Sequence, residues 1–258
     1  MSGPSLKVFI SGASSGIGAA LAANYARRGA VLGLCARRLD RLQALAAQLG
    51  GECACYRADV TVPAEMQSAA ADFLARFGPP DIVIANAGVS SGTLGASSED
   101  LAAFARVMEI NVLGIATTLQ PFVAPLVERG AGILAGIASV AGFRGLPGSG
   151  AYSASKAAAI SYLESLRVEL HGSGVAVVTI CPGYIATPMT AQNPYRMPFL
   201  LEADEAARRI ARAIDRKPPL AVIPWQMAAI AFVLRRLPRW LYDRAFARAP
   251  RKPRNLPL

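Results

Sequence analysis

The stretch LKVFISGASSGIG, residues 6–18, decides the fold. Its first half is an apolar run typical of a parallel strand buried on both faces. Its second half is a turn with the glycine spacing GxxxGxG, which lets backbone N–H groups approach a phosphate at the positive end of a helix. A strand–helix turn can also use glycine for its geometry alone, but the place of this turn after a first strand favours a nucleotide. We therefore predict a dinucleotide site on Gly12, Ser14, Ser15, Gly16, Ile17 and Gly18.

Strands and helices alternate along the rest of the chain. Apolar runs predict strands at 6–11, 31–36, 52–57, 81–85, 133–138, 175–181 and 220–223, and helical spacing predicts helices between them. The helix predicted for 101–129 contains Pro121 and Pro125, which we expect to kink or divide it. This β-α-β order predicts an α/β fold: a single-domain, Rossmann-like three-layer α/β/α sandwich with a doubly wound parallel sheet over residues 1–223. Residues 184–201 should form a substrate loop, and residues 224–258 a basic C-terminal helical extension.

Composition excludes several kinds of site. The chain has 258 residues, four cysteines and one histidine. The cysteines lack paired CxxC spacing, so we predict neither a disulfide framework nor a metal site. His171 alone cannot supply a His-based metal centre, and a Ser-His-Asp triad is disfavoured. The first residues lack the pattern of a signal peptide, and we expect a cytoplasmic protein.

Cofactor choice should be decided after the second strand. An acidic residue there would bind the adenosine ribose 2′-OH of NAD. This chain instead has Arg37 and Arg38, whose guanidinium groups suit a 2′-phosphate. The alternative is that the two arginines are solvated side chains at the start of a helix and bind no ligand. We predict NADP as the cofactor.

Tyr152 and Lys156 form a YxxxK pattern at the head of a helix. Residues four apart share one face, so the phenol and the ammonium group point the same way. We expect the cation to lower the pKa of the phenol towards the working range of an acid–base catalyst. The pattern by itself also suits an ordinary solvated pair.

The glycine turn and the YxxxK pattern together resemble those of the short-chain dehydrogenase/reductase family, over about residues 6–223. The resemblance implies that Ser139 hydrogen-bonds a substrate carbonyl and that Asn111 holds a water that relays protons to Lys156. It implies an oxidoreductase that interconverts a carbonyl and a secondary alcohol with NADP(H). Members of the family usually form dimers or tetramers, here through the helices at 101–129 and 152–171.

Further cofactor contacts are implied by the same resemblance. Asp59 and Val60 would contact the adenine, and the segment Pro182-Gly183-Tyr184-Ile185-Ala186-Thr187 would lie beside the nicotinamide, with Ile185 and Thr187 at its carboxamide. Asn86, Ala87 and Gly88 match the family's NNAG stretch, although Ala85 replaces its first Asn.

The substrate is expected to be lipophilic. Apolar residues in and beside the loop 184–201 should line its pocket, and they suggest a ketone or a 3-oxoacyl compound: Phe143, Leu146, Pro147, Tyr184, Met189, Tyr195, Met197, Phe199 and Leu200. The alternative to an enzyme is an NADPH-binding regulatory or membrane-surface interaction protein with little turnover. Such a protein has no need to keep Ser139, Tyr152, Lys156 and Asn111 together.

The net charge of +10 is concentrated at the C-terminus. Between residues 235 and 254, Asp243 alone opposes a series of basic residues: Arg235, Arg236, Arg239, Arg244, Arg248, Arg251, Lys252 and Arg254. One interpretation is a helix that caps the substrate pocket or contacts another subunit. A second is a segment peripheral to a membrane, with apolar and Trp residues in the interface and arginines on anionic lipid. Nucleic-acid binding lacks a recognised module and is disfavoured.

Overall fold

A sheet of seven parallel strands, in the order β3-β2-β1-β4-β5-β6-β9, forms the centre of the protein. The computed structural model describes residues 5–254 and residue 256. The strands are β1 (Lys7–Ser11), β2 (Val31–Ala36), β3 (Cys53–Arg57), β4 (Ile82–Ala85), β5 (Gly132–Ile137), β6 (Val175–Pro182) and β9 (Leu220–Ile223). The order reverses between β1 and β4, as in a doubly wound fold, so the predicted fold class is confirmed.

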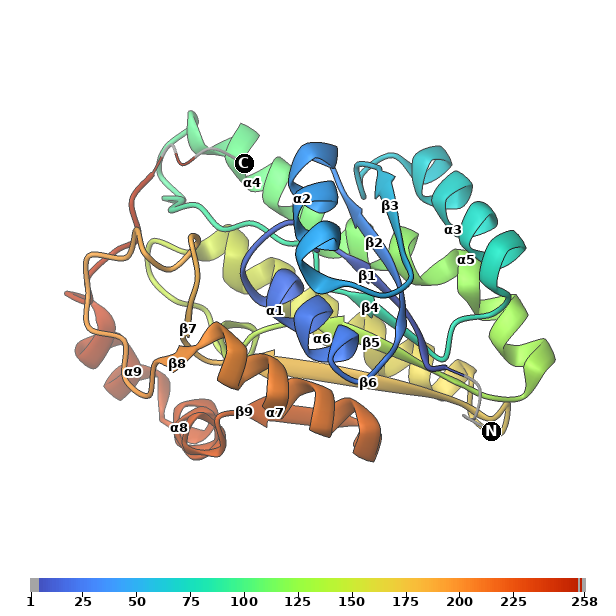
Figure 1. The fold of residues 1–258 in the computed structure, drawn as a ribbon. Helices are drawn as coiled ribbons and strands as arrows, with labels where there is room; N and C mark the ends of the chain where they lie inside the picture. Colours follow the sequence, from blue (N-terminus) through green and yellow to red (C-terminus); the bar gives the residue numbers. More distant parts are fainter. Residues whose placement is uncertain (1–4, 255, 257–258) are drawn as a thin grey trace.

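Helices cover both faces of the sheet (Figure 1). On one face lie α1 (Gly16–Ala26), α2 (Leu39–Leu49) and α7 (Ala203–Arg216), which share a core with the strands. On the other lie α3 (Pro63–Phe77), α5 (Gly114–Arg129) and α6 (Gly150–Glu169), around a second core. The strands β1, β2, β4 and β5 contribute to both cores, which explains why their sequences are apolar without alternation.

The long helical region before β5 is interrupted where the sequence did not indicate it. It consists of α4 (Asp100–Met108), a π-helical turn η1 (Glu109–Leu113) and α5, and both Pro121 and Pro125 lie inside α5. Of the prediction that these prolines kink or divide the helix, the division is wrong: the change of helical pitch occurs around Asn111. The region from Asp100 to Arg129 contains an 18-residue stretch with a mean hydropathy of 1.5, long and apolar enough to cross a membrane, but half of that stretch is buried inside the protein. We interpret it as a core helix.

The loop 184–201 is more ordered than expected. Its ends pair as two short parallel strands, β7 (Ile185–Ala186) and β8 (Leu201–Glu202). Leu201 N donates to Tyr184 O at 3.0 Å, and the rings of Tyr184 and Tyr195 meet edge to face. The predicted loop is therefore closed at its base by backbone pairing.

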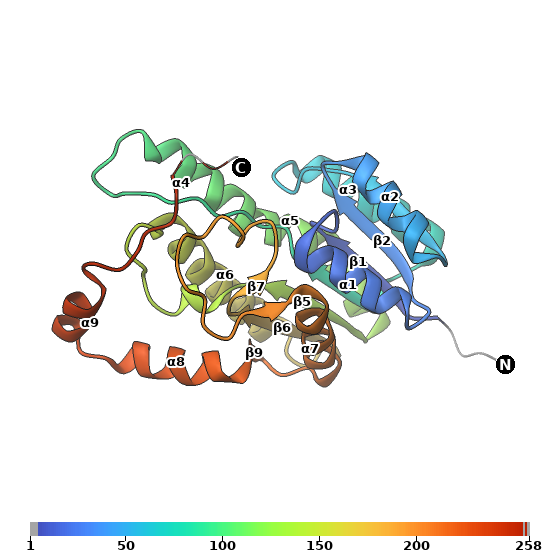
Figure 2. The same ribbon diagram turned by 60° about the vertical axis from the view of Figure 1, so that its left-hand side comes forward.

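The C-terminal extension folds back over the body of the protein. It forms α8 (Trp225–Arg236) and α9 (Arg239–Phe246), after which the chain runs back towards α4 (Figure 2). There Gly92 N donates to Pro253 O at 2.9 Å, and Arg254 pairs with the buried carboxylate of Asp100 at 3.0 Å. The extension is thus attached at its far end as well as at β9.

Candidate active site

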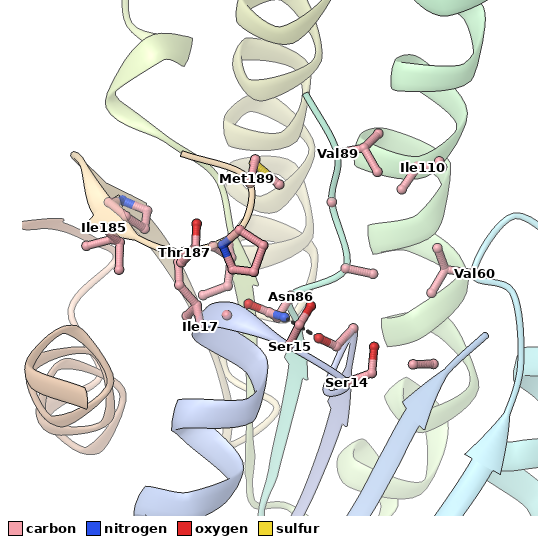
Figure 3. A pocket seen from close by; sticks show the side chains of 18 of the residues that line it. Ser14, Ser15, Ile17, Val60, Asn86, Val89, Ile110, Ile185, Thr187 and Met189 are labelled. Carbon is pink, nitrogen blue, oxygen red and sulfur yellow. Dashed lines mark hydrogen bonds between the residues drawn. The ribbon is translucent and has the colours of Figure 1, made fainter. Parts of the chain in front are cut away.

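One cleft at the carboxyl ends of the strands collects nearly all the predicted site residues, as open α/β sheets favour. Figure 3 shows Ser14, Ser15 and Ile17 at its floor, Ile185, Thr187 and Met189 along one wall, and Val60, Val89 and Ile110 along the other. The predicted residues that line it are Gly12, Ser14, Ser15, Gly16, Ile17, Arg37, Arg38, Asp59, Val60, Asn86, Ala87, Gly88, Ser139, Tyr152, Lys156, Pro182, Gly183, Ile185 and Thr187.

The glycine turn is held in an open, anion-accepting form. Gly12 has φ of +66°, and Gly18 packs beneath it, where a Cβ would lie 2.3 Å from the Gly12 carbonyl oxygen. The Ser15 side chain at the N-cap of α1 makes no capping hydrogen bond to any described residue. The first N–H groups of α1 therefore remain available to a ligand oxygen. Asn86 braces the turn, since its Nδ2 donates to the carbonyls of Ser11 and Gly12 at 3.1 and 3.2 Å.

Arg38 reaches across the cleft to the glycine turn. Its guanidinium donates to Ser14 Oγ at 3.1 Å and to Ser15 Oγ at 3.4 Å. Arg37 and Arg38 are both exposed and both line the cleft. Two arginines thus stand beside the turn in place of a carboxylate.

Asp59 lies in the cleft wall with its carboxylate already engaged. It accepts hydrogen bonds from Thr61 N at 2.9 Å and Thr61 Oγ1 at 2.8 Å, and pairs with Arg106 at 3.2 Å. Burial raises the pKa of Asp59, but these hydrogen bonds and the charge of Arg106 outweigh burial, so the pKa is lowered overall. The ionised side chain orders the segment after β3.

Ser139, Tyr152 and Lys156 meet at the inner end of the cleft. Ser139 follows β5 and starts the short 3-10 helix η2 (Val140–Gly142), where its Oγ accepts from Ala141 N at 3.1 Å. Tyr152 and Lys156 lie in the first turns of α6, as their spacing predicts. Lys156 is 4% exposed, its Nζ donates to the carbonyl of Ile137 at 2.8 Å, and it lies 5.8 Å from the centre of the Tyr152 ring.

Burial dominates the protonation of both groups. It raises the pKa of Tyr152, while a hydrogen bond with Ser139 acts in the opposite direction. Burial lowers the pKa of Lys156 to about 8. The expectation that Lys156 lowers the pKa of Tyr152 is therefore wrong for this structure, because removal from water disfavours the phenolate more than its neighbours favour it.

Asn111 lies in the π-helical turn, with its side chain fully used. Its Oδ1 accepts from Val89 N at 2.8 Å, and its Nδ2 donates to Val89 O at 2.9 Å and to Ser155 Oγ at 3.0 Å. These contacts join the segment after β4 to α6. An Asn side chain that is 0% exposed and has three partners is satisfied, so the disfavoured mid-helix Asn has a clear structural reason.

The segment after β6 forms the wall around Thr187. Thr190 Oγ1 donates to Ile185 O at 2.5 Å and accepts from Thr187 N at 3.0 Å. Thr190 also lines the cleft. This residue was not predicted, although a Thr three positions after another in a loop is a common local turn pattern.

The predicted apolar substrate wall is only partly found. Met189 lines the cleft, whereas Phe199 and Leu200 are 48% and 42% exposed. Phe143 lies instead in a separate groove beside α8. The buried hydroxyls of Ser11 and Thr118, which bond each other at 3.2 Å behind the glycine turn, were missed, since contacts 107 residues apart leave no local pattern.

Known proteins resemble this chain in sequence. A family model described as short chain dehydrogenase matches residues 7–197. An uncharacterized oxidoreductase of Myxococcus xanthus (strain DK1622) is 40% identical over 248 residues, which cover 93% of this chain and 95% of that protein.

Two solved structures are similar in fold and sequence. An alcohol dehydrogenase from the archaeon Thermococcus sibiricus, complexed with 5-hydroxy-NADP, has a TM-score of 0.74 and 29% identity, covering 84% of this chain and 95% of that one. A short-chain dehydrogenase from Streptomyces avermitilis has a TM-score of 0.81 and 25% identity, covering 93% and 94%.

Proposed function

The chain belongs to the short-chain dehydrogenase family of oxidoreductases, whose members use NAD(H) or NADP(H), and on that premise we propose that it is an NADP(H)-dependent reductase of a lipophilic ketone or 3-oxoacyl compound. The observation that carries the proposal is the position of Ser139, Tyr152 and Lys156 in the same cleft as the glycine turn and the two arginines.

The residues of the cleft fit an NADP molecule. The uncapped start of α1 and the glycine turn suit a pyrophosphate, and Arg37 and Arg38 suit a 2′-phosphate. The similar alcohol dehydrogenase was solved with an NADP derivative, which supports the same choice. Asp59 and Val60 would then hold the adenine, Lys156 the nicotinamide ribose, and Ile185 and Thr187 the carboxamide. Asn86, Ala87 and Gly88, with Pro182 and Gly183, would complete the cofactor wall.

The chain's own residues would orient the substrate and supply the proton. Bound NADPH would supply the hydride. Ser139 and Tyr152 would donate hydrogen bonds to the substrate carbonyl oxygen, and Tyr152 would give its proton to the alkoxide as it forms. A phenol whose pKa is raised by burial stays neutral at pH 7, which is the state an acid must have before it donates. Lys156 would place its charge beside Tyr152, 5.8 Å from the ring centre. Because the Asn111 side chain is engaged with Val89 and Ser155, Asn111 would hold the water that restores the proton through its backbone.

Apolar residues that line the cleft support a lipophilic substrate. They are Val89, Ile185, Pro188 and Met189, and a hydrocarbon chain or ring could be buried between them. The carbonyl group of that substrate would lie next to Ser139 and Tyr152.

A homo-oligomer is also proposed. The helices α4 and α6 carry exposed apolar side chains, namely Leu101 at 68%, Phe104 at 39% and Val168 at 61%. Exposed apolar side chains on these helices favour contact with a second copy. Light scattering on a gel-filtration column would measure the state, and a monomer at micromolar concentration would contradict it.

The test of function is a spectrophotometric assay. Purified protein is mixed with NADPH or NADH and a panel of apolar ketones and 3-oxoacyl thioesters, and the absorbance of the reduced nicotinamide is followed. We expect turnover with NADPH that disappears in Tyr152→Phe. If the protein binds NADPH tightly but turns over none of the ketones, the proposal is overturned in favour of a cofactor-binding regulator.

A further inference from the structure

The helix α8 presents an apolar face to solvent. Trp225, Ala229, Phe232 and Val233 follow the spacing of one helical face, and all four are exposed, with Trp225 at 72%, Phe232 at 57% and Val233 at 59%. In α9, Trp240 at 70% and Leu241 at 36% are exposed as well. Figure 2 shows α8 along one edge of the molecule with α9 beyond its far end.

The opposite faces of these helices are already packed. Met227 and Ala231 are buried, and Met227 packs on Gly183 at the cofactor cleft. Tyr242 of α9 donates from its Oη to Gly145 O at 2.5 Å, and the guanidinium of Arg144 lies 4.0 Å from the centre of its ring. Both helices are therefore held in place by the protein core, and the apolar surface is not a face awaiting another part of the described fold.

Arginines border this apolar surface. The guanidinium of Arg236 stacks 3.7 Å from the centre of the Phe232 ring, and that of Arg235 lies 5.6 Å from Phe143. Arg239 and Arg244, on α9, are exposed and make no hydrogen bond or ion pair within the described residues. A shallow groove joins the arginines to the apolar side chains, and its lining is Phe143, Val222, Ala228, Ala231, Phe232, Arg235 and Arg236.

We propose that the exposed face of α8 and α9 binds the surface of an anionic lipid bilayer. Trp, Phe and Val side chains would enter the boundary between headgroups and acyl chains, while the arginines meet lipid phosphates. Charge decides between a bilayer and a second copy of the chain. A symmetric dimer through this face would bring two sets of arginines together, and Asp243 alone opposes them within α8 and α9. Anionic headgroups neutralise the same charges.

The helix α8 contacts segments that belong to the proposed catalytic cleft. Arg144 donates to Leu237 O at 2.8 Å, which ties the end of α8 to the loop that follows Ser139. A lipophilic substrate dissolved in the bilayer would therefore leave it close to the cleft. This last consequence rests on the proposed function, whereas membrane binding does not.

Tryptophan fluorescence tests the proposal directly. The chain has two tryptophans, Trp225 on α8 and Trp240 on α9, and both are exposed. With vesicles of phosphatidylglycerol and phosphatidylcholine we expect the emission to shift to shorter wavelength and brominated acyl chains to quench it. With phosphatidylcholine alone we expect little change. If the emission wavelength remains that of solvent-exposed tryptophan with both kinds of vesicle, the proposal is overturned.

Variants separate the apolar and the charged contributions. Each arginine near an anionic surface contributes roughly a fivefold factor to partitioning, so Arg239→Gln with Arg244→Gln should bind anionic vesicles roughly 25-fold more weakly in co-sedimentation. Phe232→Ser should weaken binding without removing either tryptophan. The control Val62→Ser, which replaces an exposed apolar residue before α3, should bind like the unaltered chain.

The same variants distinguish the alternative occupant. Analytical ultracentrifugation without lipid gives the oligomeric state of each. If Phe232→Ser dissociates an oligomer and leaves vesicle binding unchanged, the face belongs to a second copy and the proposal fails. A far-UV spectrum and an unfolding curve like those of the unaltered chain ensure that lost binding is not lost folding.

Discussion

The guanidinium of Arg38 donates a hydrogen bond to Ser14 Oγ at 3.1 Å, and this contact links the segment after β2 to the glycine turn after β1. An anion placed at the turn would therefore meet a charged group at its edge. Because Arg38 is the N-cap of α2 while Ser14 precedes α1, the pairing depends on the parallel register of the two strands.

The substitution Arg38→Ala should weaken the binding of NADPH far more than the binding of NADH. Loss of a charged hydrogen bond to the 2′-phosphate is expected to raise the dissociation constant for NADPH roughly 10- to 100-fold, because NADH lacks that phosphate. Fluorescence titration of both cofactors measures the effect. Arg41→Ala, exposed on the same helix, is the control. An equal loss for both cofactors would contradict the assignment.

Tyr152→Phe should abolish ketone reduction and leave NADPH binding within a fewfold of the unaltered chain. Removal of a general acid is expected to lower kcat roughly 100- to 10,000-fold. Tyr162→Phe, a half-buried tyrosine on the same helix, should retain the rate. A Tyr152→Phe variant that keeps its rate would show that another group supplies the proton.

The rate of ketone reduction should depend on pH through the charge of Lys156. Burial lowers its pKa to about 8, so the ammonium charge is lost as the pH rises through that value. We expect kcat/KM for ketone reduction to fall above about pH 8. Lys156→Arg keeps its charge and should move the fall to higher pH. A profile that is the same in both proteins would exclude Lys156 as its source.

The same burial makes stability depend on pH. The pKa of Lys156 is about 8 in the folded chain against 10.5 for the ordinary side chain, so the unfolded chain binds more protons between these values. Stability should therefore rise with pH across this window. The variant Lys156→Met has no ammonium group to bury, so its free energy of unfolding should not show this rise. If the variant is more stable than the unaltered chain at pH 7, that difference in free energy should shrink towards pH 10. Urea unfolding of both proteins at the two pH values gives the difference, and a constant gap would be inconsistent with a buried ammonium.

Asn111→Ala should destabilise the fold. It removes three hydrogen bonds in the interior and leaves Val89 N, Val89 O and Ser155 Oγ without their partner. We expect a loss of about 2–4 kcal/mol in the free energy of unfolding by denaturant. Asn193→Ala, in the loop 184–201, should cost far less. A loss below about 0.5 kcal/mol would mean that water replaces the amide.

Much of the fold and of the candidate site follows from local pattern. The apolar runs of β2 and β9, the glycine turn and the spacing of Tyr152 and Lys156 each depend on neighbours within a few residues, and the structure has them where the sequence indicates. The cleft then gathers the residues that follow the strands, because parallel strands end at one edge of the sheet.

Other features were decided only by packing. The π-helical turn at Asn111 exists where that side chain bonds Val89 and Ser155, and the prolines that seemed to mark a break do not divide α5. The pKa of Lys156 depends on how much water the surrounding helices exclude. Arg254 meets Asp100, 154 residues away, and so returns the C-terminal extension to α4.

The sequence by itself thus determined the order of strands and helices, the chemistry of the turn and the identity of the catalytic candidates, because periodicity and turn geometry are local properties. Only the tertiary structure decided which groups are buried, which arginine reaches the turn and which face of α8 is left to solvent. Those properties depend on distances between segments far apart in the chain, and no local pattern specifies such distances.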